Sequence, residues 1–216
     1  MATQNSIYKK TQDLTVDPGA SGDSFVQFDI NGTGEFRVGV DDTDDSFRIS
    51  QGSALGTNDT FIMTAAGERT MPLQPAFLAV LSTTQNNVTG NNTKYSYVCD
   101  TEVFDQNSDY NNTTGIFTAP VTGRYVISAR IYLSDCTTVE NVTIWIVASN
   151  RSAFSGYSRE ASSSDIFTEF TFIVDMDAAD TVYPQARSYG EGADTLDLEG
   201  VSGVEARTAF SGYLAC

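Results

Sequence analysis

The chain has 216 residues, which is enough for one medium domain with an extension or for two small domains. Its 28 acidic and 12 basic residues give a net charge of −16 and a surface that repels phosphate backbones and anionic headgroups, so we expect neither nucleic-acid binding nor membrane insertion. Histidine is absent, which excludes histidine-based triads and zinc sites. No phosphate-binding or dinucleotide-binding glycine motif occurs. We therefore predict that the protein is not an enzyme and needs no organic cofactor.

The first 22 residues are polar and contain no apolar run that could form a signal-peptide core or a membrane span. Pro18 and Gly22 near their end are typical of a loop. We predict that residues 1–22 form an extended arm that anchors the chain to other proteins. The basic pair Lys9 and Lys10 could dock on an acidic partner, or could only keep the arm soluble. Without a signal sequence, we expect synthesis in a cytoplasm.

Residues 23–71 contain short runs in which apolar and polar residues alternate, separated by turn residues such as Asn31-Gly32. The runs are SFVQFDI (24–30), EFRVGV (35–40), SFRIS (46–50) and TFIMTA (60–65). Alternation over about five residues predicts strands. So few short strands cannot enclose a core, and we therefore expect a β-rich stem that buries its apolar face against identical chains about a common axis.

Four aspartates, Asp41, Asp42, Asp44 and Asp45, fall in one turn of this stem. Hard cations take several carboxylate oxygens, so the turn is a candidate Ca²⁺ site. It lacks the ligand order of an EF-hand and its closing glutamate. A solvated turn between two strands is the alternative.

From residue 72 onwards the alternating runs are longer. In GRYVISARIYL (123–133), Tyr125, Ile127 and Ile131 share one face, and Val126 and Tyr132 share the other. Runs of the same kind occur at NVTIWIVAS (141–149) and DIFTEFTFIVDM (165–176). Period-two alternation without a helical stretch predicts an antiparallel sandwich or barrel over residues 72–216, and hence an all-β chain.

The chain has one tryptophan and three cysteines. Trp145 lies on the face of its strand opposite Ile144. Its side chain could therefore pack in the core against a second sheet, lie in a subunit interface, or form a platform for a ligand. Cys99, Cys136 and Cys216 are too few for a disulfide framework. Two alternatives remain open for them: one disulfide bridge plus one free thiol, or three free thiols. We expect Cys99 to be a small core residue.

Residues 34–68 resemble a segment that is common in phage tail-fibre and tail-spike proteins. The segment combines an aromatic alternating strand, an Asp-rich turn, a Phe-x-Ile-Ser strand, a Leu-Gly-Thr-Asn-Asp turn and a strand that ends in a glycine turn. In that family the segment belongs to a trimeric shaft. The resemblance implies a virion protein that is made in the host cytoplasm.

Within the C-terminal region, Asn112, Phe117, Gly123 and Tyr125 follow one another at spacings of five, six and two residues. This Asn, aromatic, Gly-x-Tyr pattern resembles the signature of the globular domain of complement component one q, in the tumour-necrosis-factor-like jelly-roll superfamily. Ile127 stands where members of that family usually have phenylalanine.

The chain ends in TAFSGYLA, in which Phe210, Gly212 and Tyr213 resemble the closing strand of the same family. The resemblance spans residues 74–216. It implies a jelly-roll head that forms a homotrimer, and it does not identify a ligand.

Together, the two resemblances imply a virion fibre whose N-terminus attaches to the particle and whose head binds a host surface glycan or protein. Adaptable polar and aromatic residues fill four expected distal loops, 83–98, 134–141, 150–164 and 187–200. The candidate contacts are Tyr95, Tyr97, Tyr157 and Tyr189, with packing as the alternative role. A capsid decoration or head-fibre protein without a receptor is the second hypothesis, and a cellular adhesin or secreted complement-like ligand is the third.

Overall fold

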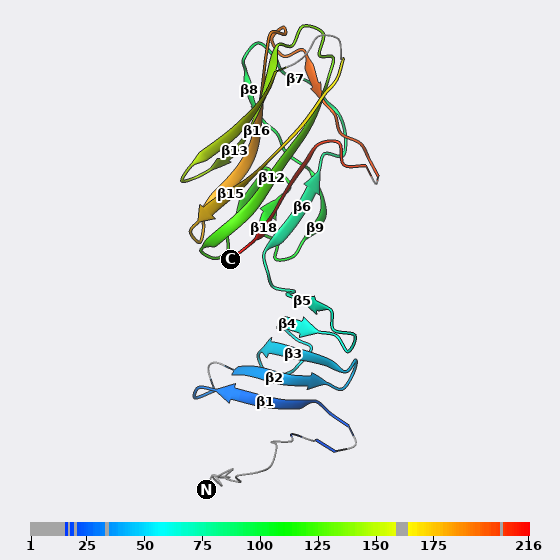
Figure 1. Cartoon of the computed structure of the whole chain (residues 1–216), viewed down its shortest axis with the longest axis vertical. Helices are drawn as coiled ribbons and strands as arrows, with labels where there is room; N and C mark the ends of the chain where they lie inside the picture. The colour runs from blue at the N-terminus through cyan, green and yellow to red at the C-terminus, as the bar shows by residue number, and fades with distance from the viewer. Residues whose placement is uncertain (1–15, 17, 20, 33–34, 159–163, 204) are drawn as a thin grey trace. The chain divides into compact units, whose positions relative to one another are not determined.

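The computed structural model describes residues 16, 18–19, 21–32, 35–158, 164–203 and 205–216. All the regular secondary structure in these residues is β, which confirms the predicted fold class (Figure 1). The chain divides into two compact units, residues 1–73 and 74–216, against an expected boundary after residue 71. Most of the predicted arm, including Lys9 and Lys10, lies outside the described residues.

The first unit is one antiparallel sheet whose strands follow in chain order. It consists of β1 (Ser24–Asp29), β2 (Glu35–Asp41), β3 (Ser46–Gln51), β4 (Asp59–Met63) and β5 (Arg69–Thr70). The turns contain Asn31, Asp45 and Asn58 at positive φ, a conformation that Asn and Asp side chains tolerate. Each of the four predicted runs therefore corresponds to one strand, with turn residues between them.

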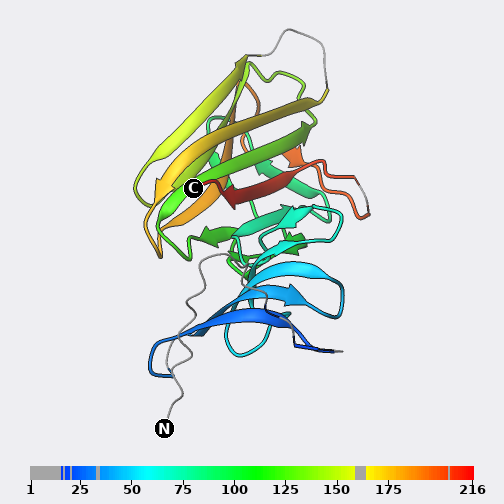
Figure 2. The ribbon, with the colours of Figure 1, turned by 60° about the horizontal axis from the view of Figure 1, so that its bottom comes forward.

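The second unit is a sandwich of two antiparallel sheets (Figure 2). The seven-stranded sheet has the order β7 (Gln85–Thr89), β17 (Leu196–Leu198), β12 (Gly123–Ser134), β18 (Ala209–Leu214), β6 (Ala76–Val80) and β9 (Thr101–Asp105), with β15 (Ile166–Met176) also paired to β12. The six-stranded sheet has the order β10 (Tyr110–Asn111), β11 (Ile116–Thr118), β16 (Thr181–Tyr189), β13 (Asn141–Ala148) and β14 (Ser152–Ser158), with β8 (Lys94–Ser96) also paired to β16. We call this unit the head and the first unit the stem.

The head encloses a core of aromatic and aliphatic side chains. Phe77 lies at its centre, with ring centroids 4.7 Å from Phe117, 5.0 Å from Tyr110 and 5.2 Å from Phe210. Phe117 also contacts Tyr125, whose hydroxyl donates a hydrogen bond to the carbonyl of Val121 at 2.7 Å. Along β12, buried residues alternate with partly exposed ones, as the alternation predicts.

The structure places three residues of the family signature, Gly212, Asn112 and Tyr213, in different settings. A Cβ atom on Gly212 would lie 2.5 Å from Ile127 Cδ1 and 3.0 Å from Phe77, so the glycine makes room for both side chains. Asn112 is exposed, and the turn that contains it is closed by Asn111, whose side chain accepts hydrogen bonds from the backbone of Thr113 and Thr114. Tyr213 points outward, with 51 % of its surface exposed.

None of the three cysteines forms a disulfide bond, so the chain has three thiols and no bridge. Cys99 and Cys136 are buried, and burial raises the pKa of the Cys99 thiol, whereas Cys216 is exposed. Because the thiolate is the reactive form, we expect one thiol per native chain to react with an aromatic disulfide reagent at pH 8, and three after unfolding. Two or more fast-reacting thiols in the native protein would contradict this burial.

Candidate functional site

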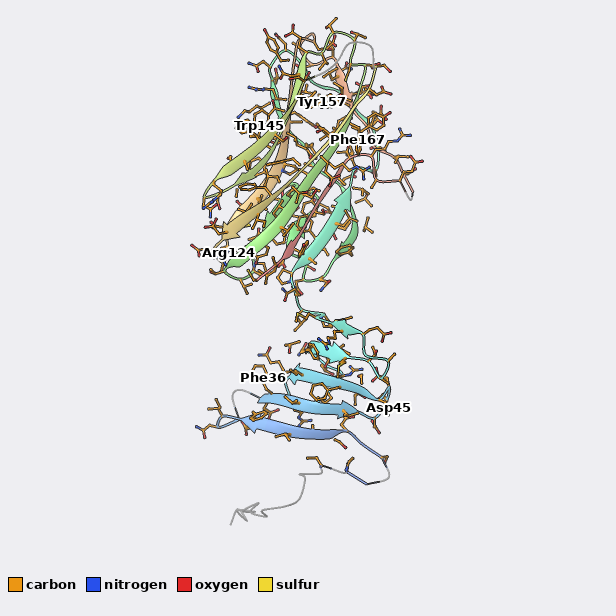
Figure 3. The ribbon with its side chains drawn as sticks, viewed as in Figure 1. Phe36, Asp45, Arg124, Trp145, Tyr157 and Phe167 are labelled. Atoms are coloured by element: carbon orange, nitrogen blue, oxygen red, sulfur yellow. The ribbon has the colours of Figure 1, made fainter. Side chains whose placement is uncertain are left out.

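One face of the stem sheet is predominantly apolar. Cross-strand pairing joins Phe28 to Phe36, and it joins Val26 to Val38 and onward to Ile49. The apolar side chains of this face are Val26, Phe28, Phe36, Val38, Val40, Phe47, Ile49, Phe61 and Met63, and the face also carries Ser24, Gln51 and Arg69. Phe28 is 57 % exposed and Phe36 (labelled in Figure 3) is 44 % exposed, so no second layer of the described stem covers them. Such a face on a single-layer sheet requires a partner.

The opposite face of the stem sheet carries a network of charges around Arg48. Its guanidinium lies 2.6 Å from Asp59, 2.7 Å from Asp44 and 3.3 Å from Asp41. Ser50 donates a further hydrogen bond to Asp59. Asp41 and Asp59 are both buried, so Arg48 compensates carboxylates that have lost most of their hydration.

The network changes the interpretation of the aspartate turn. Asp41 and Asp44 pair with Arg48, and hydrogen bonding to Ser46, followed by Arg48, lowers the pKa of Asp44. Among the described residues, the carboxylates that converge are Asp41, Asp42 and Asp23, which lies outside the predicted set. Asp42 accepts a hydrogen bond from the backbone of Gly22, and Asp45 lies in the turn at a φ of 58°. The four predicted Ca²⁺ ligands therefore do not form one group.

In the head, the outer face of the seven-stranded sheet exposes large apolar side chains. Tyr213, Val126 and Ile173 form one row across β18, β12 and β15. Ile173 is 58 % exposed, and Phe167 on the same strand (labelled in Figure 3) is 49 % exposed. The guanidinium of Arg130 lies 4.4 Å from the centre of the Phe167 ring. This face is suited to association with another apolar surface.

The outer face of the six-stranded sheet is more polar and surrounds the single tryptophan. Trp145 on β13 (Figure 3) is only 8 % exposed. The Lys94 ammonium and the Arg187 guanidinium lie over its ring, at 4.8 Å and 4.9 Å from the ring centre. Phe154 on β14 lies 5.9 Å away between ring centroids and is 66 % exposed. Trp145 is therefore on the outside of the second sheet and outside the enclosed core.

One end of the head gathers loops from separate parts of the chain. Asn91 donates its backbone N–H to the carbonyl of Glu191, and the Glu191 carboxylate accepts hydrogen bonds from Thr138 and Thr137. Partial burial raises the pKa of the Glu191 carboxyl, but these hydrogen bonds outweigh it, and the pKa is lowered overall. We call this the loop end. At the opposite end of the head, β6 begins and the C-terminus lies, since Arg124 donates its N–H to the carbonyl of Cys216.

Two of the four tyrosines predicted as surface contacts are placed otherwise. Tyr97 is 1 % exposed in the core, and burial raises its pKa well above the usual value, so its prediction as a contact residue is wrong. Tyr95 is half-buried against the core and donates its hydroxyl to Gln85. Tyr157 and Tyr189 are 45 % and 46 % exposed, and they flank the first residues of β13 near the loop end. Their role as contacts stays a prediction.

The expected distal loops also need correction. The segments 83–98 and 187–200 contain β7, β8 and β17, and the segment 150–164 contains β14, with residues 159–163 outside the described residues. The turn between β13 and β14 lies at the end opposite the loop end, because Ser149 bonds to Thr181 at the start of β16. Strand spacing in the sequence did not show which turns share one end.

The comparison with protein-family models matches residues 76–215 to the C1q domain. The chain belongs to the C1q-domain family. Among solved structures, the globular domain of zebrafish complement 1qA protein is similar, with 19 % sequence identity and a TM-score of 0.46, covering 66 % of this chain and 98 % of that one. A search of curated proteins gave no match.

Membership of the C1q-domain family confirms the resemblance of the head to complement component one q. Domains of this family are typically non-catalytic and generally form trimers. The match does not extend to the stem, so its resemblance to phage fibres stays a prediction. Within the described residues of this C1q-domain protein, no helix could cross a membrane.

Sequence reasoning missed Lys94, Arg187 and Phe154 as site residues. They meet around Trp145 only because β8, β16 and β14 are placed next to or near β13 in one sheet. Phe154, Lys94 and Arg187 carry no local sequence motif. The one signal in the sequence is the presence of aromatic and basic residues at alternating positions of strands that become neighbours in the sheet.

Proposed function

We propose that this chain is a homotrimeric virion fibre, of a bacteriophage, that attaches to the particle through its N-terminal region and binds the host surface with its C1q head. The observation that carries the proposal is the apolar face of the stem sheet, on which Phe28 and Phe36 are half-exposed in a single chain. Three stems that bury this face against one another would form a shaft. The similarity of residues 34–68 to phage fibre segments supports the same assembly.

The head supports the proposal in two ways. C1q domains generally form trimers, and the outer face of the seven-stranded sheet offers Ile173, Phe167 and Tyr213 for that contact. Within the head, the loop end lies opposite the start of β6 and the C-terminus, and it exposes Tyr157 and Tyr189 as candidate ligand contacts. Three linked heads would raise weak single-site affinity by multivalency.

Light scattering on the full chain tests the assembly. We expect three times the chain mass of 23.3 kDa. We also expect the double substitution Phe28→Ser and Phe36→Ser to remove hydrogen-exchange protection from β1–β3, because each buried phenylalanine contributes about 1.5–3 kcal/mol. Gln27→Ala, on the opposite face of β1, is the matched control and should leave protection unchanged.

A monomeric full chain would overturn the fibre assembly, and so would stem protection that persists in the double variant. Host binding has a separate test in particles whose gene lacks residues 74–216. Intact particles that no longer adsorb to host cells would support the proposal. Particles that lose integrity would instead support a capsid-stabilising role.

A further inference from the structure

We infer that the outer face of the six-stranded sheet around Trp145 is a binding site for a sugar that carries a carboxylate. The inference names a ligand class for the binding head proposed above and uses a different set of residues from its trimer contact. The site consists of Lys94, Phe154, Gln185 and Arg187, with Trp145 beneath the two cations.

The first step concerns the two positive charges. Arg187 and Lys94 are direct register partners on β16 and β8, an arrangement of like charges that destabilises a sheet. Both charges lie within 5 Å of the Trp145 ring, whose negative face attracts cations. Trp145 therefore acts as a positioning residue that holds both cations side by side on the surface.

The second step is that the described part of the chain supplies no anion for this pair. Arg48, Arg151 and Arg207 each form an ion pair with a carboxylate, whereas Lys94 and Arg187 form none among the described residues. This holds although the chain has 28 acidic residues and 12 basic ones. Two adjacent, uncompensated cations on an acidic protein favour an anionic ligand.

The third step concerns the shape and chemistry around the cations. Phe154 offers a ring that is 66 % exposed, and Gln185, the register partner of Trp145, donates its side-chain amide to Ser96. An apolar ring suits the flat face of a sugar, and amide and hydroxyl groups suit its hydroxyls. The charge of −16 repels a polyanion such as a nucleic acid far more strongly than one carboxylate.

The test uses the purified full-length protein on an array of carboxylated, sulfated and neutral glycans. We expect binding to carboxylated glycans, with 3′-sialyllactose and glucuronate-terminated oligosaccharides as the carboxylated probes and lactose as a neutral match. Trp145 is the only tryptophan, so its fluorescence should change on titration with the bound glycan and thereby report on this site. The double variant Lys94→Gln and Arg187→Gln should lose affinity about tenfold or more.

Arg151→Gln is the control, because it removes one exposed positive charge at the β13–β14 turn. It should bind as the parent does. Phe154→Ser, at an exposed position, should weaken binding without unfolding the head. Binding to no carboxylated glycan, equal binding to lactose, preference for sulfated glycans, or equal affinity in the double variant would each overturn the inference. Trimer mass and particle adsorption would remain as independent tests of the fibre.

Discussion

Replacement of Phe77 by alanine is expected to lower the free energy of unfolding of the head by about 3–5 kcal/mol. Phe77 is 1 % exposed and its ring contacts those of Tyr110, Phe117 and Phe210, so truncation leaves a cavity that joins both sheets. Urea unfolding followed by the fluorescence of Trp145 measures this loss, because the only tryptophan of the chain lies in the head. The protein concentration must be fixed, since assembly contributes to stability.

Phe154→Ala provides the matched control for Phe77→Ala. It removes the same side chain from a position that is 66 % exposed, where substitutions usually change stability by no more than about 0.5 kcal/mol. Similar losses in the two variants would show that the aromatic cluster is not the centre of the core. Phe77→Leu should fall between them, because it retains most of the buried apolar surface.

Replacement of Arg48 by methionine is expected to destabilise the stem by about 3–5 kcal/mol. Without the guanidinium, the carboxylates of Asp41 and Asp59 remain buried without a cation. Hydrogen-exchange protection of the β2–β4 amides should fall sharply, while that of β12 in the head stays unchanged. Exchange is the right measurement because the stem has no tryptophan.

Arg69→Met is the control for Arg48→Met, since Arg69 is exposed on β5 and forms no ion pair among the described residues. A second variant separates the charge from the packing. Adding Asp59→Asn to Arg48→Met should restore part of the protection, because one uncompensated carboxylate is removed. A further loss on adding Asp59→Asn would mean that Asp59 stabilises the stem independently of Arg48.

The two faces of the head differ in a way that bears on function. The seven-stranded sheet exposes Ile173, Phe167 and Tyr213, which suits contact between copies. The six-stranded sheet exposes cations over a tryptophan, with a phenylalanine beside them, which suits a small polar ligand. An arrangement of this kind would let one C1q domain assemble and bind at the same time.

The aspartate turn illustrates the limit of local patterns. Four carboxylates within five residues predicted a cation site, yet Arg48 takes two of them, Asp41 and Asp44, as ion-pair partners. Arg48 follows the turn closely in sequence, but its third partner, Asp59, comes from the next strand. The network exists because β3 pairs with β4, and the residues of the turn alone carry no sign of that pairing.

By itself, the sequence determined the longer strands, such as β12 and β15, and which of their side chains share a face, since a period of two residues is a property of the extended backbone. It also determined the family of the head, through the spacing of Asn112, Phe117, Gly123 and Tyr125. Only the tertiary structure decided that Tyr97 is buried, that Trp145 faces outward and that Lys94 and Arg187 meet over its ring. The reason is physical: strand order and register are set by pairing between segments far apart in the chain, and alternation within one strand is the same whichever face is covered.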